Sequence, residues 1–103
     1  MKVTALAPAM GAEITGLDLA KGDFKSGLID DIRAVWLEHH LLVLRDQNLS
    51  PQRQLELARA LGEPDIYPFL EGLDEFPEIT SVLKREDETV NFGGVWHTDT
   101  IYQ

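Results

Sequence analysis

The apolar run LLVL at residues 41–44 constrains the fold most, because it stands directly after a helix pattern. A short, wholly apolar run with a polar exit at Arg45 is typical of a buried strand. Residues 26–39 repeat apolar side chains at about 3.6-residue spacing, which predicts an amphipathic helix. Ser26 is a residue type that caps helices, and we expect it to begin this one. A helix followed by a buried strand predicts a layered domain.

A second helix pattern follows the same apolar run. Ser50 is a favourable N-cap residue, and Pro51 suits the first helical position. Gly62 is typical of a helix end, and Pro64 prevents the helix from resuming. The sequence therefore predicts a helix over residues 51–61, and it places the strand at residues 41–45 between two helices.

The remaining segments alternate strand patterns with loops. The alternating apolar residues predict strands in four further segments: 2–8, 11–19, 78–84 and 95–102. The glycine-, proline- and acid-rich stretches at 65–77 and 85–94 predict loops. This order predicts a mixed α+β, mostly β fold with two flanking helices. The predicted sheet has not closed by the last residue.

Composition excludes several classes of function. The net charge is −9, from 18 acidic and 9 basic residues, which disfavours binding to nucleic acid. The chain has no cysteine, which excludes disulfides, thiolate zinc sites and a thiol nucleophile. It shows no signal-peptide pattern and no apolar run long enough to cross a membrane. We therefore expect a cytoplasmic protein without a membrane partner.

His97 and Asp99 form the clearest candidate metal-binding pair. Side chains at positions i and i+2 of a strand point to the same face, so both can approach one ion. Together with a second, distant histidine they would complete a 2-His-1-carboxylate facial triad, which leaves three positions open on an octahedral Fe(II). A bidentate co-substrate and O₂ would occupy those positions. The alternative is a hydrogen-bonded surface pair, because a His-x-Asp motif alone is weakly specific.

Three other residues near these patterns have simpler interpretations. Strand alternation turns Trp96 away from the His97 face, so we expect it to be a core residue. His39 and His40 stand at the end of the first predicted helix, where a protonated imidazole would interact favourably with the helix dipole. We do not expect either histidine to be a metal ligand.

Three segments of the sequence together resemble the taurine dioxygenase-like family. "LLVLRDQNLSPQRQLELARALGEP" (41–64) is similar to the family's N-terminal signature, and "GAEITGLDL" (11–19) is similar to the segment upstream of it. "GGVWHTDTIY" (93–102) resembles the family's Trp-His-Thr/Ser-Asp metal motif. All three occur in the family's order and close to its spacing, so the resemblance extends from about residue 3 to the last residue.

The resemblance implies a non-haem Fe(II)- and 2-oxoglutarate-dependent dioxygenase. The implied fold is a double-stranded β-helix, or jelly roll, of which residues 1–103 would be the N-terminal portion of a single domain. The implied metal ligands and catalytic residues are His97 and Asp99. The family's distal histidine and its 2-oxoglutarate-binding arginine and threonine come later in the family. We expect a homo-oligomer that takes a small-molecule substrate and O₂.

The resemblance also directs attention to substrate-binding residues. In members acting on taurine, a histidine precedes the proline that follows the Gly-Glu turn, and here Tyr67 holds that place before Pro68. An asparagine stands a few residues ahead of the Trp-His pair in those members, whereas here that place holds Gly93 and the nearby amide is Asn91. We expect Tyr67 and Asn91 to contact a small, anionic substrate other than taurine.

Two further functions remain open from the sequence. The chain could be a non-catalytic, truncated product that oligomerises. It could also be part of a zinc-dependent hydrolase that uses His97 and Asp99, although no second histidine or glutamate stands at zinc-like spacing from them.

Overall fold

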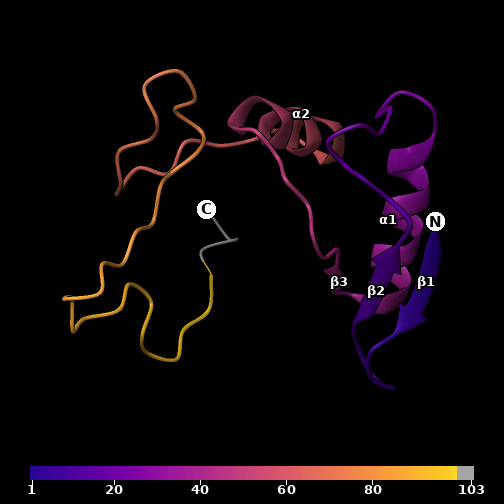
Figure 1. The fold of residues 1–103 in the computed structure, drawn as a ribbon, viewed down its shortest axis with the longest axis horizontal. Helices are drawn as coiled ribbons and strands as arrows, with labels where there is room; N and C mark the ends of the chain where they lie inside the picture. The colour runs from indigo at the N-terminus through magenta and orange to yellow at the C-terminus, as the bar shows by residue number, and fades with distance from the viewer. Residues whose placement is uncertain (100–103) are drawn as a thin grey trace.

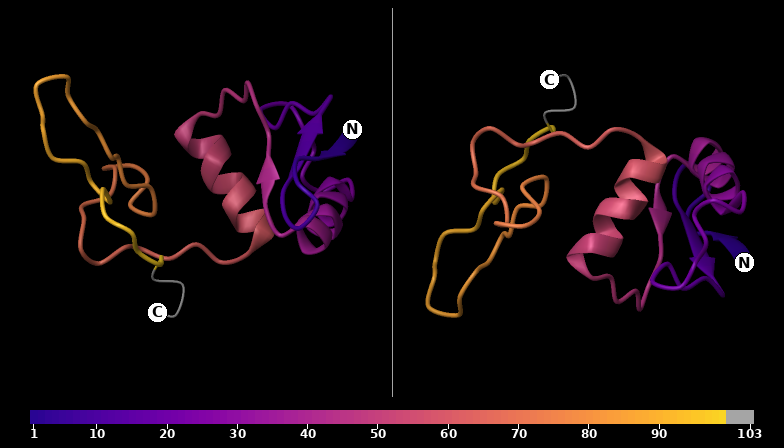
Figure 2. Two further views of the ribbon diagram at one scale, coloured as in Figure 1. Left: turned by 90° about the horizontal axis from the view of Figure 1, so that it is seen from below. Right: turned by 90° about the horizontal axis from the view of Figure 1, so that it is seen from above.

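The protein is described by a computed structural model that covers residues 1–99. Three strands form one sheet in the order β1-β2-β3, and two helices accompany it. These elements occupy the first 61 residues. Figures 1 and 2 show the chain after helix α2 as an irregular segment, which lies on the α2 side and apart from the sheet. The site predicted at His97 therefore belongs to a different part of the molecule from the sheet.

The sheet pairs the N-terminal hairpin with the short strand that follows helix α1. Strand β1 (Lys2–Ala5) runs antiparallel to β2 (Ala12–Thr15). Strand β2 runs parallel to β3 (Leu42–Val43), with Ala12 opposite Leu42. Parallel neighbours need a crossover connection, and α1 supplies it here. Both hairpin strands were predicted, and both are shorter than the predicted segments.

Helix α1 (Leu28–His39) begins without a side-chain cap. The residue before it is Gly27 with φ 88°, a left-handed conformation that glycine adopts at little cost. The predicted cap at Ser26 is wrong, because its hydroxyl donates to the carbonyl of Asp23 at 2.8 Å instead. The helix ends at His40, whose N–H donates to the carbonyl of Trp36 at 2.7 Å.

Helix α2 (Pro51–Leu61) has the predicted caps. The Ser50 hydroxyl oxygen accepts a hydrogen bond from the N–H of Arg53 at 3.2 Å, and Pro51 occupies the first helical position. At the other end, the N–H of Gly62 donates to the carbonyl of Ala58 at 2.9 Å. The predicted helix over residues 51–61 is therefore confirmed to the residue.

The core lies where the sheet meets the two helices. Its buried apolar side chains come from β2, both helices and the loop between β2 and α1: Ala12, Ile14, Leu19, Ile29, Ile32 and Leu55. The predicted strand at 41–45 has the right position, but only Leu42–Val43 pair, and both residues are half-buried. Leu41 is 50% exposed. The apolar run is therefore less covered than its composition predicts.

The strands predicted at 78–84 and 95–102 are absent from the part of the chain that the structure describes. Residues 78–84 and 95–99 are irregular, and positions 100–102 lie outside the described residues. A strand needs a neighbouring strand to pair its backbone, and residues 1–99 provide none for either segment. Trp96, expected in the core, is fully exposed at 104%. Without strand pairing, the expected alternation of buried and exposed side chains does not arise.

The fold class is confirmed in its coarse form only. A three-stranded sheet with two helices is an α+β arrangement, whereas the double-stranded β-helix stays a prediction. Within residues 1–99, neither helix has the length and apolar character needed to span a bilayer. The cytoplasmic location and the homo-oligomer also stay predictions.

Candidate metal centre

His97 and Asp99 converge although their segment is not a strand. The His97 Nε2 atom lies 3.4 Å from the Asp99 Oδ1 atom. Two donor atoms bound at right angles to one metal, each about 2.1 Å away, would lie about 3 Å apart. The observed separation is close to that value, so both atoms can approach one ion with small side-chain movements.

A second contact selects the ring nitrogen of His97 that is free to bind metal. His97 Nδ1 lies 2.8 Å from the carbonyl oxygen of Val95. A carbonyl only accepts hydrogen bonds, so Nδ1 carries the hydrogen and donates it, which in a neutral ring leaves a lone pair on Nε2. A backbone carbonyl that fixes the tautomer in this way is a common feature of metal-binding histidines. Nε2, the nitrogen that faces Asp99, is therefore the metal-binding atom.

The pair supplies two ligands and no more. Both side chains are accessible, with 52% of His97 and 84% of Asp99 exposed. No group of three metal-ligating side chains occurs among residues 1–99. One nitrogen and one carboxylate oxygen suit Fe(II), and they match two of the three positions of a facial triad. A closed zinc site would need four ligands, which the described residues do not bring together.

A pocket of about 450 Å³ opens beside this pair. Its volume falls within the usual range for small-molecule sites, about 300–1,000 Å³. Tyr67 lines it together with His97 and Asp99, so the structure places a predicted substrate-binding residue beside the predicted metal ligands. The other lining side chains are Leu70, Glu78, Thr80, Val82, Phe92, Val95 and Thr98.

Asn91, the other predicted substrate-binding residue, does not line this pocket. It lines a separate depression with Lys84 and Glu88, on the far side of the same loop. Phe92, the next residue in the chain, faces both spaces. The sequence analysis missed Leu70, Thr80 and Phe92 as lining residues. Its loop and strand patterns carry no signal for which side chains of an irregular segment share a cavity.

Two local features hold this pocket together. The Glu78 carboxylate lies 3.3 Å from the guanidinium of Arg59, which ties the loop to helix α2. Gly93 has a φ of 67°, and a Cβ atom there would lie 3.4 Å from Cε1 of the His97 ring. Any side chain at this position would be strained and would crowd the imidazole. Glycine therefore allows the backbone to approach the metal-binding ring.

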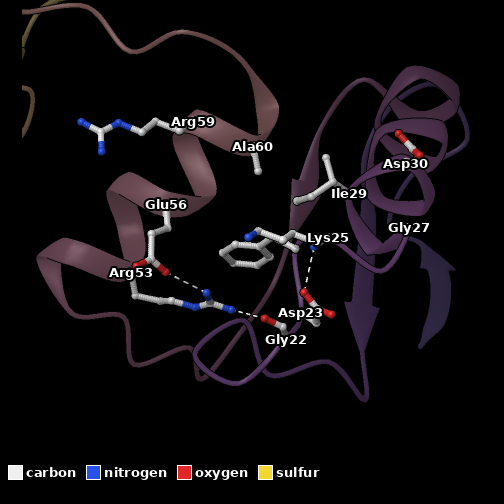
Figure 3. Close-up of a pocket in the computed structure, with 11 residues that line it drawn as sticks. Gly22, Asp23, Lys25, Gly27, Ile29, Asp30, Arg53, Glu56, Arg59 and Ala60 are labelled. Carbon is white, nitrogen blue, oxygen red and sulfur yellow. Dashed lines mark hydrogen bonds and ion pairs between the residues drawn. The ribbon is translucent and has the colours of Figure 1, made fainter.

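A larger pocket, of about 720 Å³, lies between helix α2 and the loop before α1. Figure 3 shows Arg53 reaching across it to the carbonyl of Gly22 and to Glu56. The same guanidinium donates to the carbonyl of Leu19 at 2.9 Å and lies 3.7 Å from the ring centre of Phe24. This hydrogen bonding lowers the pKa of Glu56 below its ordinary value. Arg53 thus joins loop to helix, and its hydrogen-bonding groups are already used.

Comparison with known proteins agrees with the motif at His97. The family model described as "Taurine catabolism dioxygenase TauD, TfdA family" matches residues 2–103. The chain belongs to this TauD/TfdA family. The match spans both the capped helix α2 and the His97–Asp99 pair, so it includes the fold and the candidate metal centre.

Individual members of the family are similar along most of the chain. An (S)-phenoxypropionate/alpha-ketoglutarate-dioxygenase of Sphingobium herbicidovorans is 40% identical over 106 residues, which is 97% of this chain and 35% of that protein. The crystal structure of a taurine dioxygenase from Burkholderia xenovorans has a TM-score of 0.69 and 26% identity. It covers 81% of this chain and 31% of its own. A putative alpha-ketoglutarate-dependent taurine dioxygenase from the same organism has a TM-score of 0.67 and 30% identity, covering 82% and 31%.

This chain spans about a third of the length of these TauD/TfdA relatives. It carries the family's Trp-His-Thr-Asp sequence at residues 96–99. What the described residues supply is therefore one side of a site.

Proposed function

We propose that this chain is the N-terminal portion of an Fe(II)- and 2-oxoglutarate-dependent dioxygenase that hydroxylates a small, anionic organic substrate. The observation that carries the proposal is the 3.4 Å approach of His97 Nε2 to Asp99 Oδ1 at the edge of a small-molecule-sized pocket. The family membership supports the same assignment. Residues 1–103 would form part of one domain with the chain that follows them in the family.

His97 and Asp99 would hold the iron through Nε2 and a carboxylate oxygen. When bound, the iron supplies the activation of O₂, coupled to the conversion of 2-oxoglutarate to succinate and CO₂ and to the hydroxylation of the substrate. The Val95 carbonyl keeps the His97 ring in the tautomer that binds metal. A bond from carbonyl to imidazole also orients the ring, so little ordering would remain when the metal binds.

Tyr67 is the substrate-binding residue that we propose with most structural support. It lines the pocket that His97 and Asp99 border, and its hydroxyl can donate a hydrogen bond to a substrate oxygen. Asn91 would contact the same substrate only if the loop at 85–94 moved, because its side chain lies in the neighbouring depression. Substrate contact by Asn91 is therefore the weaker part of the proposal.

The test is metal- and co-substrate-dependent turnover by the intact protein. We expect O₂ uptake and succinate release that require both Fe(II) and 2-oxoglutarate and that rise when a small organic acid is added. Zn(II) should not replace Fe(II), because zinc has no redox chemistry. Hydrolysis supported by Zn(II), without O₂ uptake, would instead identify a hydrolase and contradict the proposal.

A further inference from the structure

Apolar side chains are exposed on the wall of the pocket that faces His97. We define the apolar wall as Leu70, Val82 and Phe92, which come from two loops separated in the sequence. Val82 is 58% exposed and Phe92 is 68% exposed. Exposed apolar groups gathered at one place are unfavourable in water, and they indicate a surface that binds another apolar group.

The charges of this pocket are unsuited to a second anion. Among its described lining residues, the ionised side chains at neutral pH are the carboxylates of Glu78 and Asp99, and no lysine or arginine is present. Arg59 pairs with Glu78 and is not among those lining residues. Residues 100–103 are Thr, Ile, Tyr and Gln, so they add no cation either. An acidic group placed against this wall would lose water without gaining a cationic partner.

From these two observations we propose that the apolar wall binds the hydrocarbon part of the substrate and so selects acids that carry a ring or a comparable apolar group. The inference rests on the proposed function, and it adds the orientation of the substrate. The acid group points away from Leu70, Val82 and Phe92. Tyr67, whose ring lies edge-on to Phe69 at 5.4 Å between centres, stands at the polar end of the same pocket.

The selectivity should reside in Leu70 and Phe92. Truncating either side chain removes apolar contact with a ring and removes little from a substrate that has only a methyl group there. Pockets discriminate hydrocarbon groups of different size by about tenfold or more. Both side chains are exposed in the unliganded pocket, so their loss should change folding little.

The experiment compares phenoxyacetate with methoxyacetate in the intact protein. These acids share an ether oxygen and a carboxylate, and they differ in the ring. We expect Leu70→Ala and Phe92→Ala each to lower kcat/KM for phenoxyacetate by about tenfold, and for methoxyacetate by less than about twofold. Leu83→Ala is the matched control, because Leu83 is exposed and lines the neighbouring depression only. It should change neither value.

Two outcomes would overturn the inference: an equal loss for both acids, or no loss for phenoxyacetate. Binding of anisole, a neutral ring without an acid group, tests the wall separately from catalysis. We expect equilibrium dialysis of the metal-free protein to show anisole binding that weakens in Leu70→Ala and not in Leu83→Ala. If succinate release fails while anisole binds in this pattern, the proposed function is wrong and the apolar wall stands. Anisole binding that is absent, or unchanged in Leu70→Ala, contradicts the wall.

Discussion

At the residue scale, the candidate site depends on what surrounds the His97 ring. The carbonyl of Val95 fixes its tautomer, Asp99 approaches its free nitrogen, and Gly93 lies against its edge. The sequence alone predicted the ligand pair from spacing, and the structure brings the pair together without the strand on which that prediction relied. A short segment that turns back on itself can also place positions i and i+2 close together.

Replacing Gly93 should disturb this arrangement. Gly93→Ala introduces a Cβ atom 3.4 Å from the His97 ring at a φ of 67°. We expect it to cost about 1–2 kcal/mol in local conformational free energy and to weaken Fe(II) binding severalfold. Gly62→Ala is the control, because its φ is 179° and a Cβ atom there meets nothing within 4 Å. Fe(II) titration of both variants checks the prediction, and equal affinities in the two would contradict it.

Substrate preference is the second prediction at this scale. Taurine-acting members have a histidine and an asparagine where this chain resembles them with Tyr67 and Gly93, so we expect taurine not to be the best substrate. Succinate yield from taurine, alkyl sulfates and aryloxy acids, measured at equal concentrations in the intact protein, checks this. Taurine giving the highest yield of the panel would show that those two positions do not determine preference.

At the element scale, local signals predicted the helices well and the later strands poorly. The caps and apolar spacing of α2 lie within its own sequence, so Ser50, Pro51 and Gly62 fixed both its ends. A strand depends on a neighbour elsewhere in the chain, and alternation at 78–84 or 95–99 says nothing about whether that neighbour is present. The start of α1 shows the same limit, because the capping candidate Ser26 bonds to a turn instead.

The two serines give a matched test of helix capping. Ser50→Ala removes the acceptor of the Arg53 N–H, and we expect it to lower the free energy of unfolding by about 1 kcal/mol. Ser26→Ala removes an exposed hydroxyl that caps no helix, so its effect should be clearly smaller. Urea unfolding of the two variants checks this. An effect of Ser26→Ala as large as that of Ser50→Ala would contradict the assigned caps.

At the scale of the whole molecule, much apolar surface is uncovered. A groove between α1, β3 and α2 is lined by apolar side chains, including Ile32, Trp36 and Leu57. Within residues 1–99, strands β1 and β3 are the outer strands of the sheet, and each has an unpaired edge. Unpaired edges and exposed apolar surface favour association with another chain.

The 103-residue chain by itself should therefore self-associate or fold incompletely. We expect light scattering to show oligomers or aggregates, and Fe(II) binding to be weak because two ligands must be ordered for few bonds. An oxygen electrode should record no uptake that depends on 2-oxoglutarate. A monodisperse monomer that consumes O₂ only with Fe(II) and 2-oxoglutarate would show that residues 1–103 suffice.

The assignment of His97 as an iron ligand is tested most directly by Fe(II) binding and succinate release in the intact His97→Ala variant. We predict that both fall to background, because a facial triad that has lost one ligand does not hold the metal in place. His39→Gln serves as the control, since His39 ends helix α1 outside the pocket, and both activities should persist in it. Succinate release by His97→Ala at the rate of the unaltered protein would contradict the account.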